Sequence, residues 1–576
     1  MHRFFPIIAW LGNYKKKFFF NDLFAGLTVG VILIPQGMAY AMIAGLPPVY
    51  GLYASLLPVL SYVFLGTSRQ IAIGPVAMDS LLVAASLGTL AISGIENYIA
   101  MVIVLTLLVG AIQFTLGIFK MGFLVNYLSR PVISGFTSAA ALIIIFSQLK
   151  HLLGVKIVGS SVFHQLIINA FEKIGDTNLY DFLIGLIGIV ILVLFKKINK
   201  KIPAILIVVV LGIVSVYYLK LENYGVKLVG SVPSGLPSFK IPEIDMQLLS
   251  DLWPMALAIA MVGYLEAISI GKALEEKTGV ETIEPNQELV ALGTSNIIGS
   301  FFQAYPVTAS FSRSAINGDA GAKTNLAALF SVLMVVVTLL YLTPIFYYLP
   351  NAVLASIIMV SVFKLIDLSY AKQLWFHRKD EFFVLFVTFL ATLFIGIKEG
   401  ILIGVLISLL LMVYRTSNPH FAVLGQIKDT DYFKNINRFE NDVVLQEDLL
   451  IVRFDAQLYF ANTSYFKKEL FKYIDAKGPA LKGVILNAEA INYIDSTAAN
   501  MLKKVILELQ ERKINFYIAG AIGPTRDIIF TSGIIDLVQR ENLFVKTNAA
   551  VAYFNNPEIT EGLGIKIAHQ NKTYGN

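Results

Sequence analysis

Long apolar stretches recur along the first 416 residues and constrain the fold more than any other feature. A helix needs roughly 20 apolar residues to cross a bilayer. Only 15% of the chain is charged, whereas soluble domains carry about 25% charged residues. The sequence therefore predicts an α-helical polytopic membrane protein with about fourteen candidate segments: 22–45, 49–66, 74–92, 97–118, 129–150, 179–197, 202–219, 250–272, 284–302, 308–320, 325–349, 350–368, 380–398 and 399–416.

The positive charges lie in short loops between these segments. Lysines precede the first segment at 15–17 and separate two later segments at 196–201, and His-Arg-Lys occupies 377–379. An even number of segments puts these clusters on one side, and an excess of lysine and arginine marks that side as cytoplasmic. The net charge of +6 therefore indicates a lipid bilayer, not nucleic acid, as partner. We expect a multi-pass plasma-membrane protein with both termini in the cytoplasm.

The composition changes after Arg415. From about residue 441, stretches with strand character alternate with amphipathic helices, which indicates an α/β unit. We expect five parts: an N-terminal cytoplasmic lead-in at 1–21, a transmembrane domain at 22–416, a linker at 417–440, the α/β domain at 441–556 and a polar tail at 557–576.

Several kinds of chemistry are excluded by residue usage. The chain has no cysteine, which excludes disulfides, thiolate metal sites and cysteine nucleophiles. Its six histidines show no HExxH spacing. The polar residues of the membrane segments form no catalytic triad. We therefore expect no enzyme, no metal site and no bound cofactor.

Two membrane segments are interrupted. In 66–84 a short β-like piece meets Gly74 and Pro75 before a helix, and in 303–317 an extended piece with Pro306 also precedes a helix. Interrupted segments in corresponding positions of two halves point to the midplane site of a transporter. Facing helix N-termini offer free N–H groups and positive dipole ends, which suit an anion.

Arg313 falls at the start of the second half-helix. A charge at the bilayer centre costs about 2.5–3.5 kcal/mol on insertion scales, so it should face a cavity or a partner. We interpret Arg313 as part of an anion site. The alternative is an ion pair with Asp319 or Asp79 that locks helices together.

The same segments carry a family resemblance. The stretch PQGMAYAMIAGLPPVYGLYASLLPVLSYVFLGTSRQIAIGPVA (35–77) resembles the signature region of the sulfate permease (SulP) anion transporters. Residues 285–325 resemble the family's second conserved block, and the C-terminal unit is similar to a STAS domain, the sulfate transporter and anti-sigma factor antagonist module. The resemblance implies a 7+7 inverted repeat whose two half-helices meet at the midplane. It also implies a core that moves against a gate, a cytoplasmic STAS domain and a homodimer.

The resemblance further implies a substrate site between the third and tenth segments, flanked by the first and eighth. Carried over position by position, the substrate-binding residues are Gln36, Tyr40, Pro75, Val76, Ala77, Ser312 and Arg313. An amide and a phenol can contact an oxyanion without adding negative charge. The alternative for Gln36 and Tyr40 is hydrogen bonding and packing between helices.

An anion carrier working against a negative membrane potential needs a coupling cation, because moving one charge costs about 2.3 kcal/mol per 100 mV. Relatives thought to be proton-coupled often carry glutamate where this chain has Glu266. The alternative is that Glu266 is a structural partner of Lys272 or Arg313. Asp79 departs from the apolar or small residue usual at its place, and is a second candidate for binding H⁺ or Na⁺. Some bacterial relatives have glutamate where this chain has Gln36, so no coupling is expected there.

Ser496 follows Asp495 at the end of a predicted strand and opens a helix. The matching serine is phosphorylated in STAS proteins that act as anti-sigma factor antagonists. Ser496 is therefore a candidate phosphorylation site, and a cytoplasmic regulator is a candidate partner of the domain. The alternative is that Ser496 only caps the helix.

Together these features predict a secondary active transporter of inorganic oxyanions, with proton-coupled sulfate uptake by alternating access as the leading expectation. The alternatives within the family are sodium-coupled bicarbonate symport, dicarboxylate uptake and chloride–bicarbonate exchange. An uncoupled anion channel is the alternative of another class. Retention of Glu266 and Asp79 favours coupled transport.

Overall fold

A computed structural model describes residues 6–12, 14–88, 92, 94–123, 129–156, 163–198, 203–243, 246–279, 283–439 and 442–557. The chain divides into two compact units, 1–408 and 409–576. The expected polar tail lies, except for Pro557, outside the described residues.

The first unit is built from helices that match the predicted segments. Among the described residues, seven helical stretches are long and apolar enough to cross a membrane: Lys16–Ile43, Ile95–Ile118, Arg130–Leu152, Leu249–Glu275, Leu326–Tyr348, Asn351–His377 and Glu399–Ser417. Shorter apolar helices lie between them, as expected of segments that are broken or tilted. The helical membrane fold predicted from apolar length is confirmed.

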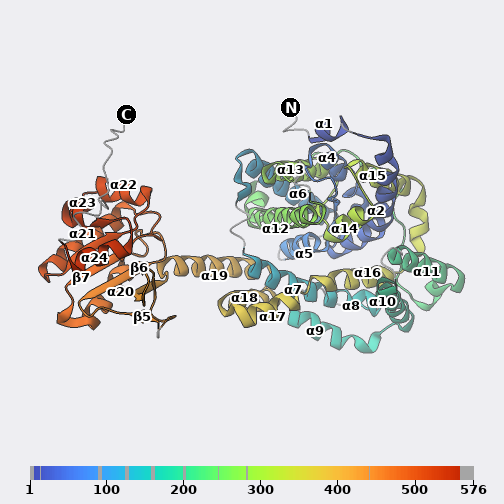
Figure 1. The fold of residues 1–576 in the computed structure, drawn as a ribbon. Coiled ribbons are helices and arrows are strands. Elements are labelled where there is room, and N and C mark those ends of the chain that lie inside the picture. The colour runs from blue at the N-terminus through green and yellow to red at the C-terminus, as the bar shows by residue number, and fades with distance from the viewer. Residues whose placement is uncertain are drawn as a thin grey trace. The chain divides into compact units, whose positions relative to one another are not determined.

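The helices form two bundles (Figure 1). The bundle that we call the core contains α2 (Lys16–Ile43), α4 (Leu57–Leu65), α5 (Ala77–Gly88), α6 (Ile95–Ile118), α12 (Met246–Thr278), α13 (Pro285–Phe301), α14 (Phe311–Asp319) and α15 (Leu326–Val337). The bundle that we call the gate contains α7 (Arg130–Ser147), α8 (Leu149–Leu152), α9 (Phe163–Glu172), α10 (Leu179–Ile198), α11 (Ala204–Leu219), α16 (Asn351–Val362), α17 (Leu368–His377) and α18 (Lys379–Phe394). Each bundle takes helices from both halves of the chain, as two interleaved repeats require.

Two short strands pair in the middle of the core. β1 (Ile73–Gly74) runs into α5, and β2 (Thr308–Ala309) runs into α14. The strands are antiparallel, with Ile73 opposite Ala309 and Gly74 opposite Thr308. Both interrupted segments are therefore extended pieces followed by half-helices, as predicted, and the pairing satisfies backbone groups that lipid could not.

The first membrane helix begins earlier than expected. α2 starts at Lys16 and a short α1 spans Pro6–Leu11, so helix occupies part of the 1–21 range assigned to a lead-in. Lys16 and Lys17 are exposed at the first turn of α2. A lysine can bury its methylene stem while its ammonium stays in water, so the two lysines do not prevent helix formation.

The second unit is an α/β domain with a seven-stranded sheet in the order β4-β3-β6-β7-β8-β9, with β5 paired to β3. Its strands are β3 (Phe421–Ile427), β4 (Phe433–Asn435), β5 (Val443–Val444), β6 (Leu449–Phe454), β7 (Gly483–Asn487), β8 (Asn515–Ala519) and β9 (Leu543–Phe544). Its helices are α20 (Thr463–Lys477), α21 (Ser496–Glu511), α22 (Gly523–Thr531), α23 (Ile534–Val538) and α24 (Thr547–Asn555). The range 417–440, expected to be a linker, contains β3 and β4, and β3 pairs with β6. The sheet therefore begins at Phe421 and not after residue 440.

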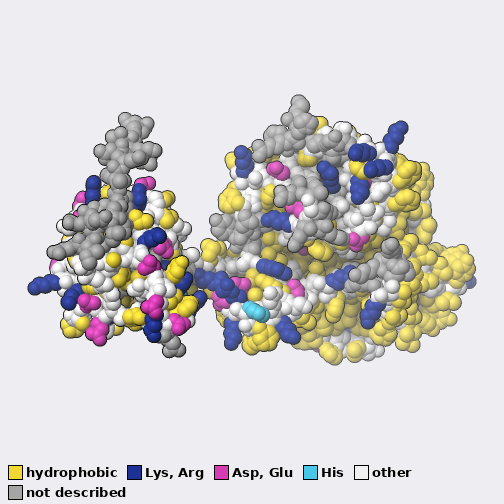
Figure 2. All heavy atoms as spheres, in the orientation of Figure 1, with side chains coloured by type: hydrophobic (Ala, Val, Ile, Leu, Met, Phe, Trp, Pro, Cys, Tyr) yellow, Lys and Arg dark blue, Asp and Glu magenta, His cyan; other side chains and the backbone are white. Residues whose placement is uncertain are grey.

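The surfaces of the two units differ in the way that a membrane and water would require (Figure 2). Apolar side chains cover the helical unit around α10 and α11, where Ile187, Leu211 and Tyr218 are exposed. On the α/β unit, lysine, arginine, aspartate and glutamate are scattered over the visible face. The exposed apolar surface of the first unit fits contact with lipid.

Candidate anion site and its membrane carboxylates

The two half-helices are held together where they begin. Besides the β1–β2 pairing, the Ser310 N–H donates to the Ala72 carbonyl at 3.0 Å, and the Ala72 N–H donates to Ser314 Oγ at 2.9 Å. Asn317 Nδ2 donates to the Gln70 carbonyl at 3.0 Å. The start of α14 is therefore bonded to residues 70–72, just before β1 and the stretch that leads into α5, although more than 200 residues separate α14 from α5 in sequence.

Arg313 lies between these two helix starts and is fully buried. Its Nη2 donates to the Pro75 carbonyl at 2.8 Å, and its Nη1 donates to Gln36 Oε1 at 3.4 Å. Its Nε is buried without a hydrogen-bond partner in the part of the chain that the structure describes. Within that part, neither Asp79 nor Asp319 forms an ion pair with it, so the guanidinium joins the two half-helices without a carboxylate partner.

Both helix starts leave backbone donors unused by the helices themselves, since the first N–H groups of a helix have no partner within it. In α14, Ser310 is the N-cap and its Oγ accepts from the Arg313 N–H at 3.4 Å. The N–H groups of Phe311 and Ser312 also belong to the first turn of α14 and precede the Arg313 N–H that Ser310 caps. In α5, the Val76 carbonyl accepts from the Ser80 N–H, and Ala77 is the first helical residue. Arg313, in the first turn of α14, reaches Pro75 two residues before α5, so the positive N-terminal ends of both helices lie near its guanidinium.

The structure brings most of the predicted binding residues to this place. Gln36 and Pro75 bind Arg313 directly, and the buried Tyr40 phenol interacts with Arg313 electrostatically. Ala77 is buried. Val76 and Ser312 are half-buried at the starts of their helices.

Tyr305 also lies at this candidate site, although it was not predicted from the sequence. It is buried, accepts a hydrogen bond from Ser80 Oγ at 3.2 Å and lies near Arg313, Tyr40 and Asp79. Tyr305 precedes Pro306 in the extended piece that leads to α14. An aromatic residue in an interrupted membrane segment is the sequence signal that could have identified it.

A buried amide network supports the site from behind and was also missed. The Asn296 side chain bonds both backbone groups of Val307, at 2.9 Å and 3.1 Å, and donates to Gln113 Oε1 at 3.0 Å. Gln113 Nε2 donates in turn to the Ala260 carbonyl at 3.1 Å. This network connects α6, α12 and α13 to the residue that precedes β2. Polar residues in the middle of apolar segments were the available signal.

The two membrane carboxylates lie close together. Asp79 is in the first turn of α5, and a Cβ at Gly263 of α12 would lie 3.4 Å from its Oδ2. Glu266, one turn further along α12, interacts electrostatically with Asp79. Asp79 Oδ1 and Glu266 Oε2 are buried without hydrogen-bond partners among the described residues, and neither Lys272 nor Arg313 pairs with Glu266 there. The structural roles considered for the two carboxylates as partners of cations are therefore not seen.

Comparison with known proteins identifies the family. The profile of the sulfate permease family matches residues 19–388, and that of the STAS domain matches residues 440–550. The chain belongs to the sulfate permease family. Its resemblance to that family and to a STAS domain, expected from the two conserved blocks and the C-terminal unit, is confirmed.

Relatives in this family match nearly the whole chain. The chloroplastic sulfate transporter 4.1 of Arabidopsis thaliana is 38% identical over 570 residues, covering 95% of this chain and 82% of the relative. The high affinity sulfate transporter 2 of Stylosanthes hamata is 33% identical over 578 residues, covering 96% and 86%. The solved structure of the murine Solute Carrier 26 family member A9 anion transporter, in the inward-facing state, superposes with a TM-score of 0.88 at 29% identity, covering 96% of this chain and 94% of that one.

In the STAS domain, Ser496 is not the helix cap. Asp495 is the N-cap of α21, and its Oδ1 accepts from the Ala498 N–H at 2.7 Å. Ser496 is the first helical residue and is exposed. The alternative that Ser496 caps the helix is therefore wrong, because the neighbouring carboxylate fills that role.

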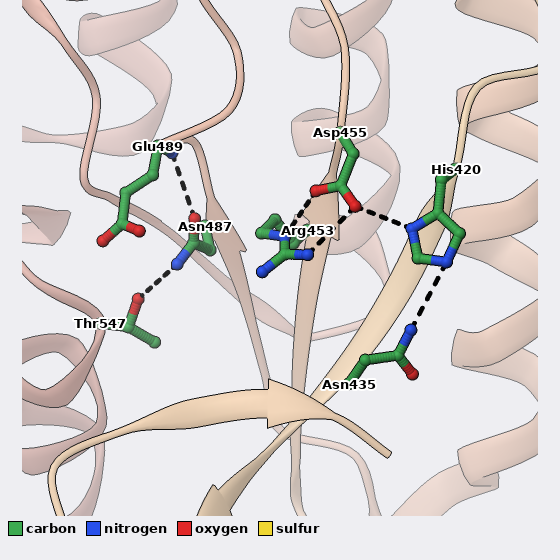
Figure 3. A network of polar contacts seen from close by, with 7 residues as sticks. All are labelled: His420, Asn435, Arg453, Asp455, Asn487, Glu489 and Thr547. Carbon is green, nitrogen blue, oxygen red and sulfur yellow. Dashed lines mark hydrogen bonds and ion pairs between the residues drawn. The ribbon is translucent and has the colours of Figure 1, made fainter. Parts of the chain in front are cut away.

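A second polar network in the STAS domain centres on Asp455 (Figure 3). Arg453 Nε and Nη2 donate to its two oxygens at 2.5 Å and 3.1 Å, and His420 Nδ1 lies 2.7 Å from Oδ2. Burial opposes ionisation of Asp455, but the bonds from Arg453 and His420 prevail and lower the pKa of its carboxyl group below 3.8. This network joins the first residue before β3 to the end of β6.

Proposed function

We propose that this protein is a secondary active transporter that takes up sulfate together with protons by alternating access. The observation that carries the proposal is Arg313, fully buried between two half-helix starts and without a carboxylate partner in the described part of the chain. A buried charge without a counter-charge is strongly unfavourable. A site that keeps one is suited to receive its counter-charge from an anionic substrate.

The donors around Arg313 suit a tetrahedral oxyanion. Three kinds of hydrogen-bond donor are available to an oxyanion: the Arg313 Nε, which has no partner among the described residues, the N–H groups at the start of α14, and the Ser312 hydroxyl. Guanidinium groups bind oxyanions with directed hydrogen bonds, and helix N-termini favour negative charge. In this proposal Gln36 and Tyr40 complete the pocket from α2, and Pro75, Val76 and Ala77 form its wall at α5.

Asp79 and Glu266 are the proposed proton carriers. Two carboxylates this close in a low-dielectric setting cannot both be charged without a large penalty. A proton held by the pair removes negative charge beside the arriving anion. Release of that proton on the other side of the membrane restores the negative charge and weakens anion binding. Proton binding and sulfate binding would then support each other. Sodium bound by the same pair is the competing coupling ion.

Sulfate as the substrate is supported by the names of the two plant relatives, which are sulfate transporters. We further propose a plasma-membrane location with both termini in the cytoplasm, a homodimeric assembly and a STAS domain that receives a cytoplasmic regulator. Within the STAS domain, the exposed Ser496 at the first position of α21 is the proposed phosphorylation site, because a phosphate there would lie at a helix N-terminus.

The test is transport by the purified full-length protein in proteoliposomes. Uptake of labelled sulfate, bicarbonate and fumarate is measured under an imposed proton gradient, a sodium gradient and neither. We expect sulfate to accumulate above its equilibrium level only with the proton gradient. Accumulation of bicarbonate with the sodium gradient would favour the alternative symporter. Several anions flowing only down their own concentration gradients, at rates that neither the proton nor the sodium gradient changes, would favour a channel.

A further inference from the structure

A small cavity lies between the core and the gate, on the far side of α12 from β2. Its lining comes from α7, α12 and α19 (Ile397–Ser417). The lining is apolar except for two polar side chains, and includes Phe136, Thr137, Val262, Leu265, Ile401 and Glu266.

The position of Glu266 on α12 explains how one side chain can lie beside both the anion site and the cavity. Residues of a helix are spaced by about 100° around its axis. Gly263 faces Asp79 and Thr308 on the anion-site side, whereas Val262 and Leu265 line the cavity. Glu266 falls between these two directions. Its carboxyl group therefore lies near Asp79 on one side and lines the cavity on the other.

We propose that Glu266 exchanges its proton with water through this cavity at the core–gate boundary, along a route separate from that of the anion. The proposal rests on the proton coupling proposed above and adds the path. The proton binds a carboxylate oxygen of Glu266 and leaves from the same group, so no other reactant is needed. The anion reaches Arg313 on the opposite side of α12.

The surroundings of Glu266 fit this separation. Among the described residues that line the cavity, no other group is titratable, and the charged group that faces Glu266 from the core is Asp79. A water molecule needs two or more polar partners in a buried site. Two groups can supply them. Glu266 Oε2 is buried without a hydrogen-bond partner in the part of the chain that the structure describes, and the Thr137 hydroxyl contacts the Ser134 carbonyl at 3.3 Å.

The test uses Thr137→Val, which removes the hydroxyl at nearly constant volume. Proton-gradient-driven sulfate uptake and sulfate–sulfate counterflow without a gradient are both measured in proteoliposomes. We expect gradient-driven uptake to fall about tenfold, the scale set by one lost hydrogen bond in the proton path, with counterflow unchanged. Thr294→Val on α13 is the matched control, because the Thr294 hydroxyl also bonds a carbonyl of its own helix, and it should leave both activities unchanged.

Absence of gradient-driven uptake in the unmodified protein would overturn the proposed coupling itself. Gradient-driven uptake in Thr137→Val equal to that in Thr294→Val would overturn only the path. A second measurement does not depend on transport: because the chain has no cysteine, Thr137→Cys carries a single thiol. A small charged methanethiosulfonate should label that thiol and not Thr294→Cys, and an unreactive thiol at position 137 would contradict the water-accessible route.

Discussion

Arg313 Nη2 donates a hydrogen bond to the Pro75 carbonyl oxygen at a distance of 2.8 Å. The bond joins the start of α14 to the residues leading into α5, and it crosses the same gap as the β1–β2 pairing. One side chain therefore connects both half-helices, while its Nε has no hydrogen-bond partner among the described residues. This relationship is the basis of the anion site proposed above.

Replacing Arg313 should remove transport while the protein still folds. Arg313→Ala loses the positive charge and two buried hydrogen bonds, so we expect sulfate uptake to fall at least about a hundredfold, as for loss of a charge-assisted contact of roughly 3 kcal/mol. Arg313→Lys keeps the charge but loses the planar fork, and should retain a small part of the activity. Uptake is measured beside size-exclusion profiles, with exposed Arg69→Ala as control. Near-normal uptake by Arg313→Ala would reduce Arg313 to a structural role.

Gly74 should not tolerate a side chain. Its φ of 142° is unfavourable for other residues, and an added Cβ would lie 3.3 Å from both Arg313 Nη2 and Leu33 Cδ1. We expect Gly74→Ala to cost about 1–3 kcal/mol of stability through backbone strain and to reduce uptake by displacing Arg313. Gly88→Ala, at the end of α5 with no described residue within 4 Å of an added Cβ, is the control. Equal melting temperatures for the two variants in detergent would show that β1 accepts a side chain.

Asn296→Ala should weaken anion binding from a distance. The change leaves the Val307 backbone groups and Gln113 without their partner, at about 1–3 kcal/mol for each unsatisfied buried group. Since Val307 precedes β2, we expect a higher KM for sulfate as well as a lower melting temperature. Ser300→Ala on the same helix removes a hydroxyl that bonds the nearby Ile297 carbonyl, and should change neither. An unchanged KM in Asn296→Ala would mean that the network stabilises the bundle without positioning the site.

Much of this arrangement could be predicted from the sequence. Apolar lengths gave the membrane helices, and Gly74-Pro75 and Pro306 marked the two breaks because glycine and proline favour backbone conformations that end a helix. The prediction that Arg313 lies at a half-helix start followed from its distance from Pro306. These features depend on local sequence.

The remaining features depend on contacts between distant residues. Nothing local indicates that Gly74 opposes Thr308 or that Asn296 reaches Gln113, because each pairing arises from packing of separate helices. The early start of the STAS sheet was missed for a similar reason. β3 begins shortly after α19 ends and pairs with the short strands β4 and β5. Its longer partner, β6, comes only after those two strands.

Glu266→Gln should separate coupling from transport. Glutamine keeps the shape of the side chain but cannot exchange a proton, so we expect proton-driven accumulation to be lost while sulfate–sulfate counterflow continues at about the normal rate. Glu284→Gln, at the exposed start of α13, should retain both. Persistence of both activities in Glu266→Gln would move the coupling role to Asp79, whose Asp79→Asn variant is then measured in the same way.

The stability of the STAS domain should depend on Asp455 in a pH-dependent way. Because the pKa of Asp455 is lowered in the folded domain, its ionised form stabilises the fold above the unfolded pKa of about 3.9, and this contribution disappears as the pH falls through the lower folded value. Asp455→Asn should therefore lower the melting temperature at pH 7 and lose its effect toward pH 3. Asp475→Asn, which removes an exposed ion pair with Arg512, should have little effect at either pH. A difference between wild type and Asp455→Asn that grows on acidification would contradict the assigned direction.

Accumulation of labelled sulfate in proteoliposomes under an imposed proton gradient tests the central claim most directly. The unmodified protein should concentrate sulfate above its external level, collapse of the gradient should release it, and Arg313→Ala should show no accumulation. Sulfate that merely equilibrates in the unmodified protein, or that accumulates equally with Arg313→Ala, would contradict the account.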